Sequence, residues 1–176
     1  MQLLYTLTDN EFPYDGINHV RDICRGIIYN DKLEIALIKI KGDDIFGHRD
    51  YYETPGGGKE KGETYRKALI REIKEELGYL IDNIKEIGLV VDYYNLLKRE
   101  NHTYYFLAHA KEKCESHQTI FEKKMFEGIV WIPYQKVVEE FNSVPNTPIS
   151  KIVKNRELPI LEIVTEYFDL LPSSKG

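Results

Sequence analysis

A glycine-rich turn followed by an acidic helical pattern occupies residues 56–79, GGGKEKGETYRKALIREIKEELGY. Glu72, Glu75 and Glu76 are spaced so that a helix of about 3.6 residues per turn puts all three carboxylates on one face. Glu63 comes about two and a half turns earlier, which assigns it to the start of the helix rather than to this cluster. Like charges at i,i+4 destabilise a helix by about 0.2–0.5 kcal/mol. A solvated face laced with salt bridges is the plain explanation, but the preceding glycine turn favours a functional site.

Three carboxylates on one helix face offer only oxygen ligands, which select hard cations such as Mg²⁺. The histidines show no HxxxH or HExxH spacing, and Cys24 and Cys114 lie far apart in the chain, so zinc is not expected. A bound cation would polarise a phosphoryl oxygen and lower the pKa of a bound water. These residues therefore predict hydrolysis of a phosphoanhydride by in-line attack of water at phosphorus.

The same stretch resembles the Nudix box, in which a glycine is followed at fixed distances by Glu, Arg-Glu, an apolar residue, Glu-Glu and Gly. The box runs over residues 57–79, and Pro55 precedes it as in the family's usual lead-in. Tyr79 is the one departure, because the family usually has an aliphatic residue there. The residues that match the pattern are Gly57, Glu63, Arg71, Glu72, Ile73, Glu75, Glu76 and Gly78.

The resemblance implies the fold and the extent of the domain. Composition by itself indicates only an α+β protein, whereas the family fold is an α/β/α sandwich with a mixed β-sheet. The box helix is then expected on one side of the sheet and a closing helix on the other. We expect one Nudix domain over residues 1–176, with a C-terminal helix at about 158–171 packed on it or, alternatively, in a homodimer interface.

The predicted metal ligands are Glu72, Glu75 and Glu76, and the resemblance adds a main-chain carbonyl, that of Gly56. The expected cofactor is Mg²⁺, with Mn²⁺ as a substitute. A plain tight turn with no ligand role is the alternative for the glycine.

The predicted catalytic residues are Glu72, Arg71 and Glu75. Arg71 would hold the carboxylates by charge-assisted hydrogen bonds, and Glu63 would support that geometry. The resemblance implies that a Glu of the box, or one downstream, is the general base, and our choice is Glu72. Many family members take a further Glu from the region after the long strands, and the sequence leaves Glu122 and Glu127 open, each with a solvated loop charge as its alternative.

Two basic residues in the expected strands before the box are predicted substrate contacts. Residues 20–29 read as a strand, and Leu33–Ile40 reads as the returning strand of a hairpin. Arg25 lies in the middle of the first strand, and Lys39 lies at the end of the second beside two core positions. Their alternatives are an edge-strand charge for Arg25 and a side chain reaching out to water for Lys39.

The remaining segments predict a further series of strands and helices. Residues 41–50 read as a polar loop, residues 99–102 as a turn between two long strands, and residues 142–157 as an irregular connector. We expect a strand over residues 128–133 and a helix over 134–141. Two tyrosine pairs in the long strands could each turn one ring toward a nucleobase, although tyrosine is also an ordinary strand former: Tyr93, Tyr94, Tyr104 and Tyr105. The expected last helix has one apolar stripe, formed by Ile160, Ile163, Val164, Tyr167 and Leu171.

Composition argues against several classes of binding partner. The net charge of −5 and the lack of a Lys/Arg run argue against a nucleic-acid binder. Two cysteines form no disulfide framework, and no apolar N-terminal signal precedes Asp9. The longest apolar run, residues 87–91, is too short to span a bilayer. We therefore expect a cytoplasmic protein with a small-molecule nucleotide substrate and neither a membrane nor a nucleic-acid partner.

The expected reaction releases a nucleoside monophosphate and the phosphorylated remainder of a nucleoside diphosphate derivative. Nucleoside triphosphates, ADP-ribose and dinucleoside polyphosphates all remain open as substrates. Two other functions are weighed. An isoprenoid diphosphate isomerase of this fold would need a catalytic cysteine, for which Cys24 is the candidate. A non-catalytic nucleotide-sensing module usually has a degraded box, and this box is intact.

Overall fold

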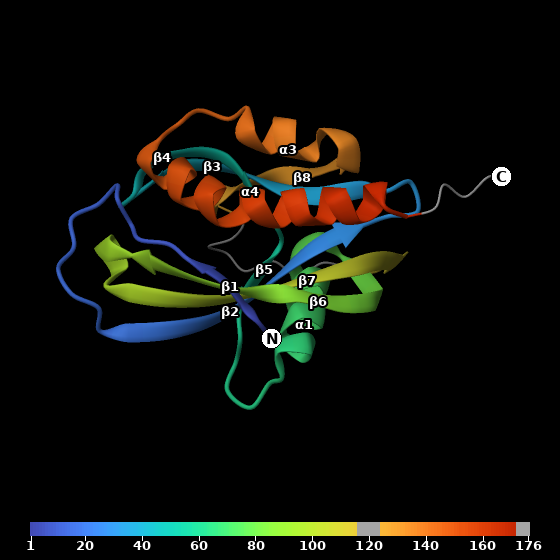
Figure 1. Ribbon diagram of the computed structural model, residues 1–176, viewed down its shortest axis with the longest axis horizontal. Helices are drawn as coiled ribbons and strands as arrows, with labels where there is room; N and C mark the ends of the chain where they lie inside the picture. Colours follow the sequence, from blue (N-terminus) through green and yellow to red (C-terminus); the bar gives the residue numbers. More distant parts are fainter. Residues whose placement is uncertain (116–123, 172–176) are drawn as a thin grey trace.

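The computed structural model describes residues 1–115 and 124–171 as a mixed β-sheet between two layers of helices. Helix α1 (Tyr65–Leu77) covers one face, and helices α3 (Tyr134–Asn142) and α4 (Pro148–Asp169) cover the other (Figure 1). This arrangement confirms the predicted α/β/α sandwich. The strands are β1 (Leu3–Thr6), β2 (His19–Tyr29), β3 (Glu34–Asp44), β4 (Gly47–Glu53), β5 (Gly56–Gly58), β6 (Tyr79–Tyr94), β7 (Arg99–Lys113) and β8 (Phe126–Pro133), with a 3₁₀ turn at Asn95–Leu97.

The sheet divides between β2 and β3. The strand order is β1-β6-β7-β2-β3-β4, with β5 added to β2 and β8 added to β3. Strands β2 and β7 run parallel and pair along the whole of β2, from His19 to Tyr29. Strands β2 and β3 share only the pair Tyr29↔Ile35 beside their turn. They therefore diverge, and the space between them leads to the glycines of β5.

Two hydrophobic cores lie on the two faces of the sheet. Alternate residues of β3 serve both cores, as a strand requires. Ile35 and Leu37 pack with α3 and α4, whereas Ala36 and Ile38 pack with α1.

The box helix α1 is capped at both ends. Thr64 is its N-cap, and its hydroxyl accepts a hydrogen bond from the Lys67 amide at 3.2 Å. Gly78 ends the helix with a φ of 69°, a left-handed conformation that glycine adopts without a Cβ penalty. Leu69, Ile73 and Leu77 are buried and anchor the helix on the sheet. Packing of this stripe fixes which way the acidic flank points.

Two of the predicted irregular segments are wrong. Residues 41–50 are not a loop, because β3 and β4 pair through this region and turn between Asp44 and Gly47. Residues 99–102 are not a turn but the first residues of β7. The chain reverses earlier, at Asn95, whose side-chain amide donates to the carbonyls of Asp9 and Phe12. These partners come from a distant segment, so local sequence gave no signal for the turn.

The predicted connector 142–157 is also wrong, because α4 begins at Pro148. Thr147 caps the helix and Pro148 occupies its first turn, where a missing N–H costs nothing. Pro159, expected at the start of a helix, lies inside α4 instead. The apolar face also differs from the predicted stripe, since Ile163 and Leu171 are exposed and Leu161 and Phe168 are buried. Among the described residues, no helix is long and apolar enough to cross a membrane.

Candidate active site

Arg71 joins the turn before α1 to the acidic flank of the helix. Its Nε and Nη2 donate to the two carboxylate oxygens of Glu63 at 2.8 and 3.0 Å. Its Nη1 donates to Glu72 at 2.7 Å and to Glu75 at 3.3 Å. Its Nη2 also donates to the carbonyl oxygen of Gly58 at 3.0 Å. One guanidinium therefore fixes three carboxylates and one main-chain carbonyl, and its hydrogen bonds lower the pKa of Glu63 to about 2.

The glycine turn lies directly against two carboxylates of α1. A Cβ at Gly57 would stand 2.5 Å from Oε2 of Glu72, so only glycine leaves this carboxylate in place. The Gly56 amide donates to Oε2 of Glu76 at 2.6 Å. Glu72 is buried, and withdrawal from water raises the pKa of Glu76 to about 8 despite that hydrogen bond. Two carboxylates thus flank the main chain of the turn, and burial makes that of Glu76 costly to ionise.

This arrangement fits a divalent cation whose coordination shell is completed by substrate phosphates and water. Within residues 1–115 and 124–171, no three His, Cys, Asp or Glu side chains already form a group that could hold a metal. Mg²⁺ does not require one, because it binds through one or two carboxylates, waters and substrate phosphates. Glu72 and Glu76 bring carboxylate oxygens of that kind to the same glycine turn. A cation would also offset the cost of keeping Glu76 ionised.

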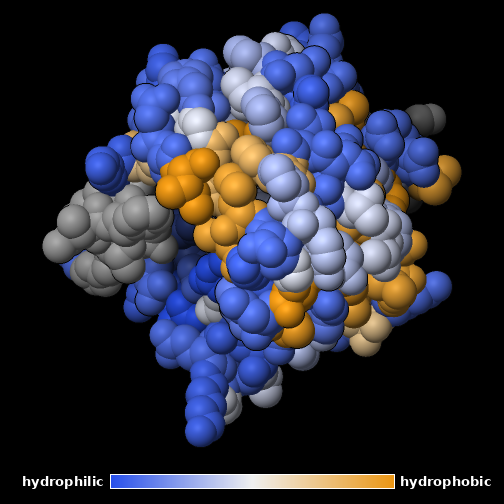
Figure 2. Space-filling model, turned by 90° about the vertical axis from the view of Figure 1, so that its left-hand side faces the viewer, coloured by the Kyte–Doolittle hydropathy of each residue, from blue (hydrophilic) through white to orange (hydrophobic). Residues whose placement is uncertain are grey.

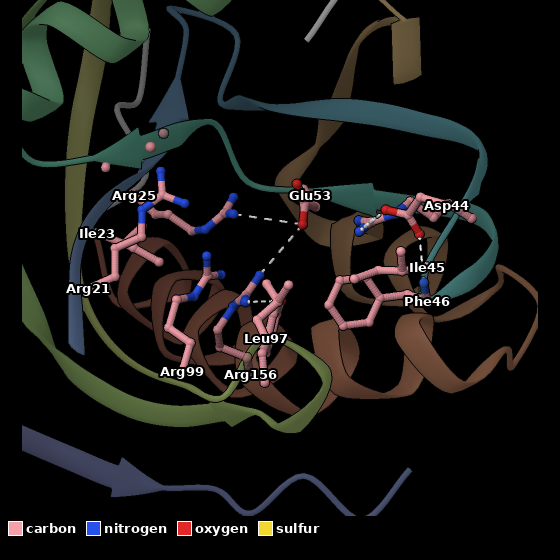
Figure 3. A pocket seen from close by; sticks show the side chains of 15 residues that line it. Arg21, Ile23, Arg25, Asp44, Ile45, Phe46, Glu53, Leu97, Arg99 and Arg156 are labelled. Atoms are coloured by element: carbon pink, nitrogen blue, oxygen red, sulfur yellow. Dashed lines mark hydrogen bonds and ion pairs between the residues drawn. The ribbon is translucent and has the colours of Figure 1, made fainter. Parts of the chain in front are cut away.

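A pocket of about 500 Å³ opens where β2 and β3 diverge. We call it the arginine pocket, because Arg21, Arg25, Arg49, Arg99 and Arg156 all line it. The labelled arginines point their guanidinium groups toward one another in Figure 3, with Leu97 beside Arg156 and with Ile45 and Phe46 on the opposite side. Figure 2 shows a hollow on this side of the molecule with hydrophilic atoms at its base and hydrophobic atoms on its rim. The pocket reaches Gly56, Gly57 and Gly58, which separate it from the carboxylates of α1.

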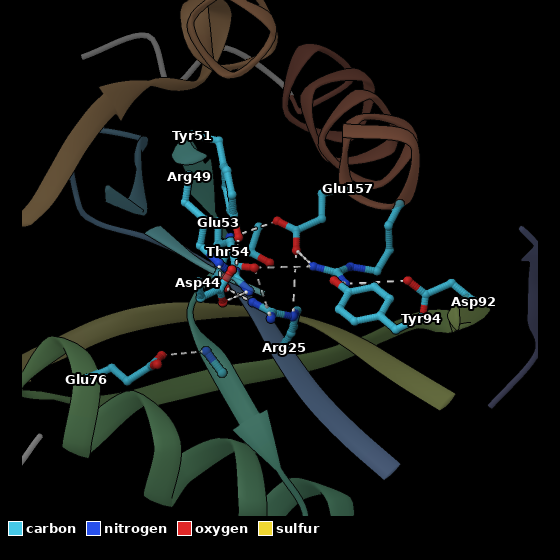
Figure 4. A network of polar contacts seen from close by, with 12 residues as sticks. Arg25, Asp44, Arg49, Tyr51, Glu53, Thr54, Glu76, Asp92, Tyr94 and Glu157 are labelled. Atoms are coloured by element: carbon cyan, nitrogen blue, oxygen red, sulfur yellow. Dashed lines mark hydrogen bonds and ion pairs between the residues drawn. The ribbon is translucent and has the colours of Figure 1, made fainter. Parts of the chain in front are cut away.

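A buried ion network forms the inner wall of this pocket (Figure 4). Glu157 of α4 is fully buried and accepts hydrogen bonds from the Thr54 amide and from Arg156, both at 2.7 Å. Arg25 donates to the Thr54 carbonyl and lies 3.6 Å from the Glu157 carboxylate. Glu53 lies 3.7 Å from both arginines. The network therefore ties α4 to the strand that leads into the glycine turn.

A smaller hollow of about 160 Å³ lies on the side of the sheet that faces α1. Glu76 lines it together with apolar side chains that include Ile38 and Phe126. Three residues line both this hollow and the arginine pocket: Asp44, Arg49 and Glu53. The carboxylate side and the arginine side of the site thus share one wall.

The two predicted substrate contacts have different surroundings. Arg25 lines the arginine pocket, but β2 is an inner strand and the guanidinium is already held by carboxylates. Lys39 is not among the residues that line either pocket. Its ammonium pairs with Asp50 at 2.5 Å and stands 4.7 Å from the centre of the Tyr52 ring. Both roles remain predictions.

The residues whose roles the sequence left undecided lie in several parts of the structure. Glu127 is half-exposed in β8 and lies 3.9 Å from Lys41, whereas Glu122 lies outside the described residues. Of the four strand tyrosines, Tyr94 lines the arginine pocket. Cys24 is fully buried, and burial raises the pKa of its thiol to about 12. That environment does not suit the catalytic cysteine an isomerase would need.

Sequence reasoning missed Arg21, Arg99 and Arg156, which line the pocket. Arg99 was assigned to a turn and Arg156 to a connector, so neither could be assigned to a face of a strand or helix. Arg21 lies in the expected first strand, two residues before Ile23, and shares a face with Arg25. That i, i+2, i+4 pattern of Arg, Ile and Arg was the one available signal.

The fold and this carboxylate-bearing helix define a class of phosphoanhydride hydrolases, and comparison with known proteins gives the family. The family model described as the NUDIX domain matches residues 21–151, and the chain belongs to this family. It is a Nudix pyrophosphohydrolase. An RNA pyrophosphohydrolase from Hydrogenovibrio crunogenus is 25% identical over 145 residues, 70% of this chain and 88% of that protein. An RNA pyrophosphohydrolase from Orientia tsutsugamushi is 46% identical over 52 residues, 30% of each chain.

Solved structures agree with the fold. A Nudix hydrolase from Nitrosomonas europaea superposes with a TM-score of 0.60 and 14% identity, covering 82% of this chain and 88% of its own. A MutT Nudix hydrolase from Burkholderia pseudomallei gives a TM-score of 0.57 and 23% identity, covering 78% of this chain and 98% of its own. Enzymes of this family use divalent metal ions and act on nucleotide substrates.

Proposed function

We propose that this pyrophosphohydrolase uses Mg²⁺ to cleave a phosphoanhydride of a nucleoside diphosphate linked to another group. The products are a nucleoside monophosphate and the phosphorylated remainder. The observation that carries the proposal is the placement of the Arg71 carboxylate cluster and the arginine pocket on either side of Gly56–Gly58. Arginines bind phosphate oxygens in a bidentate way, and carboxylates bind the cation that phosphates share.

Residues of the box, together with Gly56 just before it, have separate roles in the proposed mechanism. Glu72, Glu75 and Glu76, with the Gly56 carbonyl, would hold Mg²⁺, or Mn²⁺ as its substitute. The bound ion supplies a Lewis acid for the phosphoryl oxygen and lowers the pKa of a water. Glu72 accepts the proton of the attacking water, and Arg71 keeps that carboxylate oriented through its 2.7 Å hydrogen bond.

Substrate binding requires partner exchange at the two predicted contacts. Arg25 would turn part of its guanidinium from Glu53 or Glu157 toward a phosphate. Lys39 would leave Asp50 to reach an anion. Each exchange keeps an anion beside the cation, and the buried carboxylates that Arg25 would leave stay paired with Arg156, at 3.7 Å from Glu53 and 2.7 Å from Glu157.

The 5′-triphosphate end of RNA is a second candidate, because two relatives are named RNA pyrophosphohydrolase. The net charge of −5 favours a small nucleotide, since a long RNA strand would be repelled outside the pocket. A triphosphorylated oligonucleotide therefore belongs in any substrate panel.

The decisive experiment is product release from nucleoside triphosphates, ADP-ribose, dinucleoside polyphosphates and a 5′-triphosphorylated oligonucleotide, with Mg²⁺ and with EDTA. We expect metal-dependent turnover of at least one compound, with loss of that turnover in Glu76→Gln. Glu139→Gln is the matched control, because Glu139 is exposed on α3. Turnover that persists in EDTA or in Glu76→Gln would contradict the proposed site. Binding without turnover by the folded protein would instead favour a sensing module.

A further inference from the structure

The five arginines of the arginine pocket are not equivalent. Arg25 and Arg156 share the buried carboxylates described above, and Arg49 pairs with Asp44 at 2.7 Å. Among the described residues, Arg21 and Arg99 make no ion pair with any carboxylate. Two positive charges of the pocket are thus left without a partner of opposite sign.

Adjacent parallel strands bring these two side chains together. Strands β2 and β7 pair with His19 opposite Arg99 and Arg21 opposite Asn101. Since residues two apart on a strand share a face, Arg21 and Arg99 project from the same side of neighbouring strands. Figure 3 shows both guanidinium groups pointing into the pocket. The pKa of Arg99 is lowered by burial and by the nearby charge of Arg21, as expected for two cations held close together.

Each guanidinium is held in position by an apolar or main-chain neighbour rather than by an acid. Arg99 lies over the ring of Tyr94, 5.3 Å from its centre, and its buried Nε has no hydrogen-bond partner. Arg21 lies against the glycine turn, where a Cβ on Gly58 would come within 2.6 Å of its Nη2. A buried, unsatisfied donor and a pair of like charges are both costly without an anion.

The opposite side of the pocket has a different chemistry. Ile45 and Phe46 line it (Figure 3), with Ile45 66% exposed and Phe46 5% exposed. An aromatic and aliphatic surface suits a nucleobase, whereas the arginine side suits phosphate oxygens. A ligand with its base on the apolar side would pass its phosphates along Arg99 and Arg21 toward the glycine turn.

We propose that Arg21 and Arg99 bind the oligophosphate of the substrate, and that the preferred substrates carry three or more consecutive phosphates. This inference rests on the proposed function and selects among its substrate classes. Nucleoside triphosphates and dinucleoside polyphosphates have the charge to occupy both guanidiniums as well as a metal site. ADP-ribose has only two phosphates and a neutral terminal sugar, so it cannot satisfy all three.

The first test is binding without metal or turnover. Inorganic tripolyphosphate is titrated calorimetrically into the full chain in EDTA, with Arg21→Gln, Arg99→Gln and the control Arg66→Gln, an exposed arginine of α1. We expect Arg66→Gln to bind like the wild type and each pocket variant to bind about tenfold more weakly or worse. Equal affinity in all four proteins, or no binding by any, would overturn the inference.

The second test is kinetic. With Mg²⁺, Arg21→Gln and Arg99→Gln should raise KM for a triphosphate by about tenfold or more, with a much smaller change for ADP-ribose. Preferential turnover of ADP-ribose by the wild type would overturn this inference and leave the proposed function standing. Absence of turnover for every compound would instead overturn the proposed function.

A third measurement separates binding from a structural role. Removing one of two uncompensated like charges should leave the melting temperature of Arg99→Gln unchanged or higher. A structural arginine would lower it, and that result would count against the inference. Arg99→Lys keeps the charge but not the planar fork, so it should restore only part of the tripolyphosphate affinity.

Discussion

At the scale of single residues, Arg71 organises the carboxylates through the shape of its guanidinium. It reaches Glu63, Glu72, Glu75 and the Gly58 carbonyl at once, which the single ammonium of a lysine cannot do. We expect Arg71→Lys to lower kcat/KM by about 10–100-fold while the protein stays folded. Lys74→Arg, at an exposed position of the same helix, should have no effect. Steady-state kinetics at saturating Mg²⁺ would decide, and full activity of Arg71→Lys would show that only its charge matters.

Gly57 sets the distance between the turn and Glu72. A methyl group at this position would meet the Glu72 carboxylate, so Gly57→Ala should displace a proposed metal ligand. We expect weaker Mg²⁺ affinity and reduced turnover, measured by metal titration of the activity. Gly128→Ala is the control, because a Cβ there meets no atom within 4 Å and its φ is not positive. Equal metal titrations for both variants would contradict the role given to Gly57.

At the scale of elements, α4 stabilises the wall of the arginine pocket through Glu157. This carboxylate joins Arg156 and Arg25 to the Thr54 amide. Breaking a buried ion pair by neutralising one partner costs about 3–5 kcal/mol. Glu157→Gln should lose stability on that scale in urea unfolding, whereas Glu162→Gln, exposed on the same helix, should not. A change below about 1 kcal/mol would show that the network is dispensable.

The same helix shows where sequence reasoning stops. The acidic face of α1 and the contacts of Arg71 with its carboxylates follow from local spacing, so they could be predicted. Lys154, Arg156 and Glu157 are polar and buried in α4, which removes the apolar periodicity that announces a helix. Lys154 donates to the carbonyls of Asn142 and Val144. The charge of Arg156 is tolerated because β6, distant in sequence, supplies Asp92 and Tyr94 as partners. No window along the chain contains that information.

The pocket was unpredictable for a related reason. Arg21 and Arg99 become neighbours through the parallel pairing of β2 with β7, and parallel pairs join segments that are remote in sequence. The reversal before β7 depends on hydrogen bonds from Asn95 to Asp9 and Phe12, so Arg99 itself was misassigned. Motif spacing located the carboxylate half of the site, and only the topology of the sheet located the arginine half.

At the scale of the whole molecule, the two halves of the site belong to the two faces of the divided sheet. The carboxylates are side chains of α1 on one face, and α4 on the other face contributes Arg156 and Glu157 to the buried network behind the arginine pocket. Both ligands should therefore stabilise the native state by mass action, each through its own half. A ligand at a hundred times its dissociation constant contributes about 2.7 kcal/mol, or about 5–10 °C in melting temperature for a chain of this size.

The variants should separate these contributions in a thermal melt. Mg²⁺ alone should raise the melting temperature of Arg99→Gln but not of Glu76→Gln. Tripolyphosphate in EDTA should raise that of Glu76→Gln but not of Arg99→Gln. The wild type should respond to both, and the joint shift should exceed the sum of the separate shifts if the metal and the phosphates share ligands, because each then improves the binding of the other. Joint shifts no larger than that sum would place the two ligands in independent sites, whereas loss of both responses in either variant would mean that the two halves form one cooperative unit.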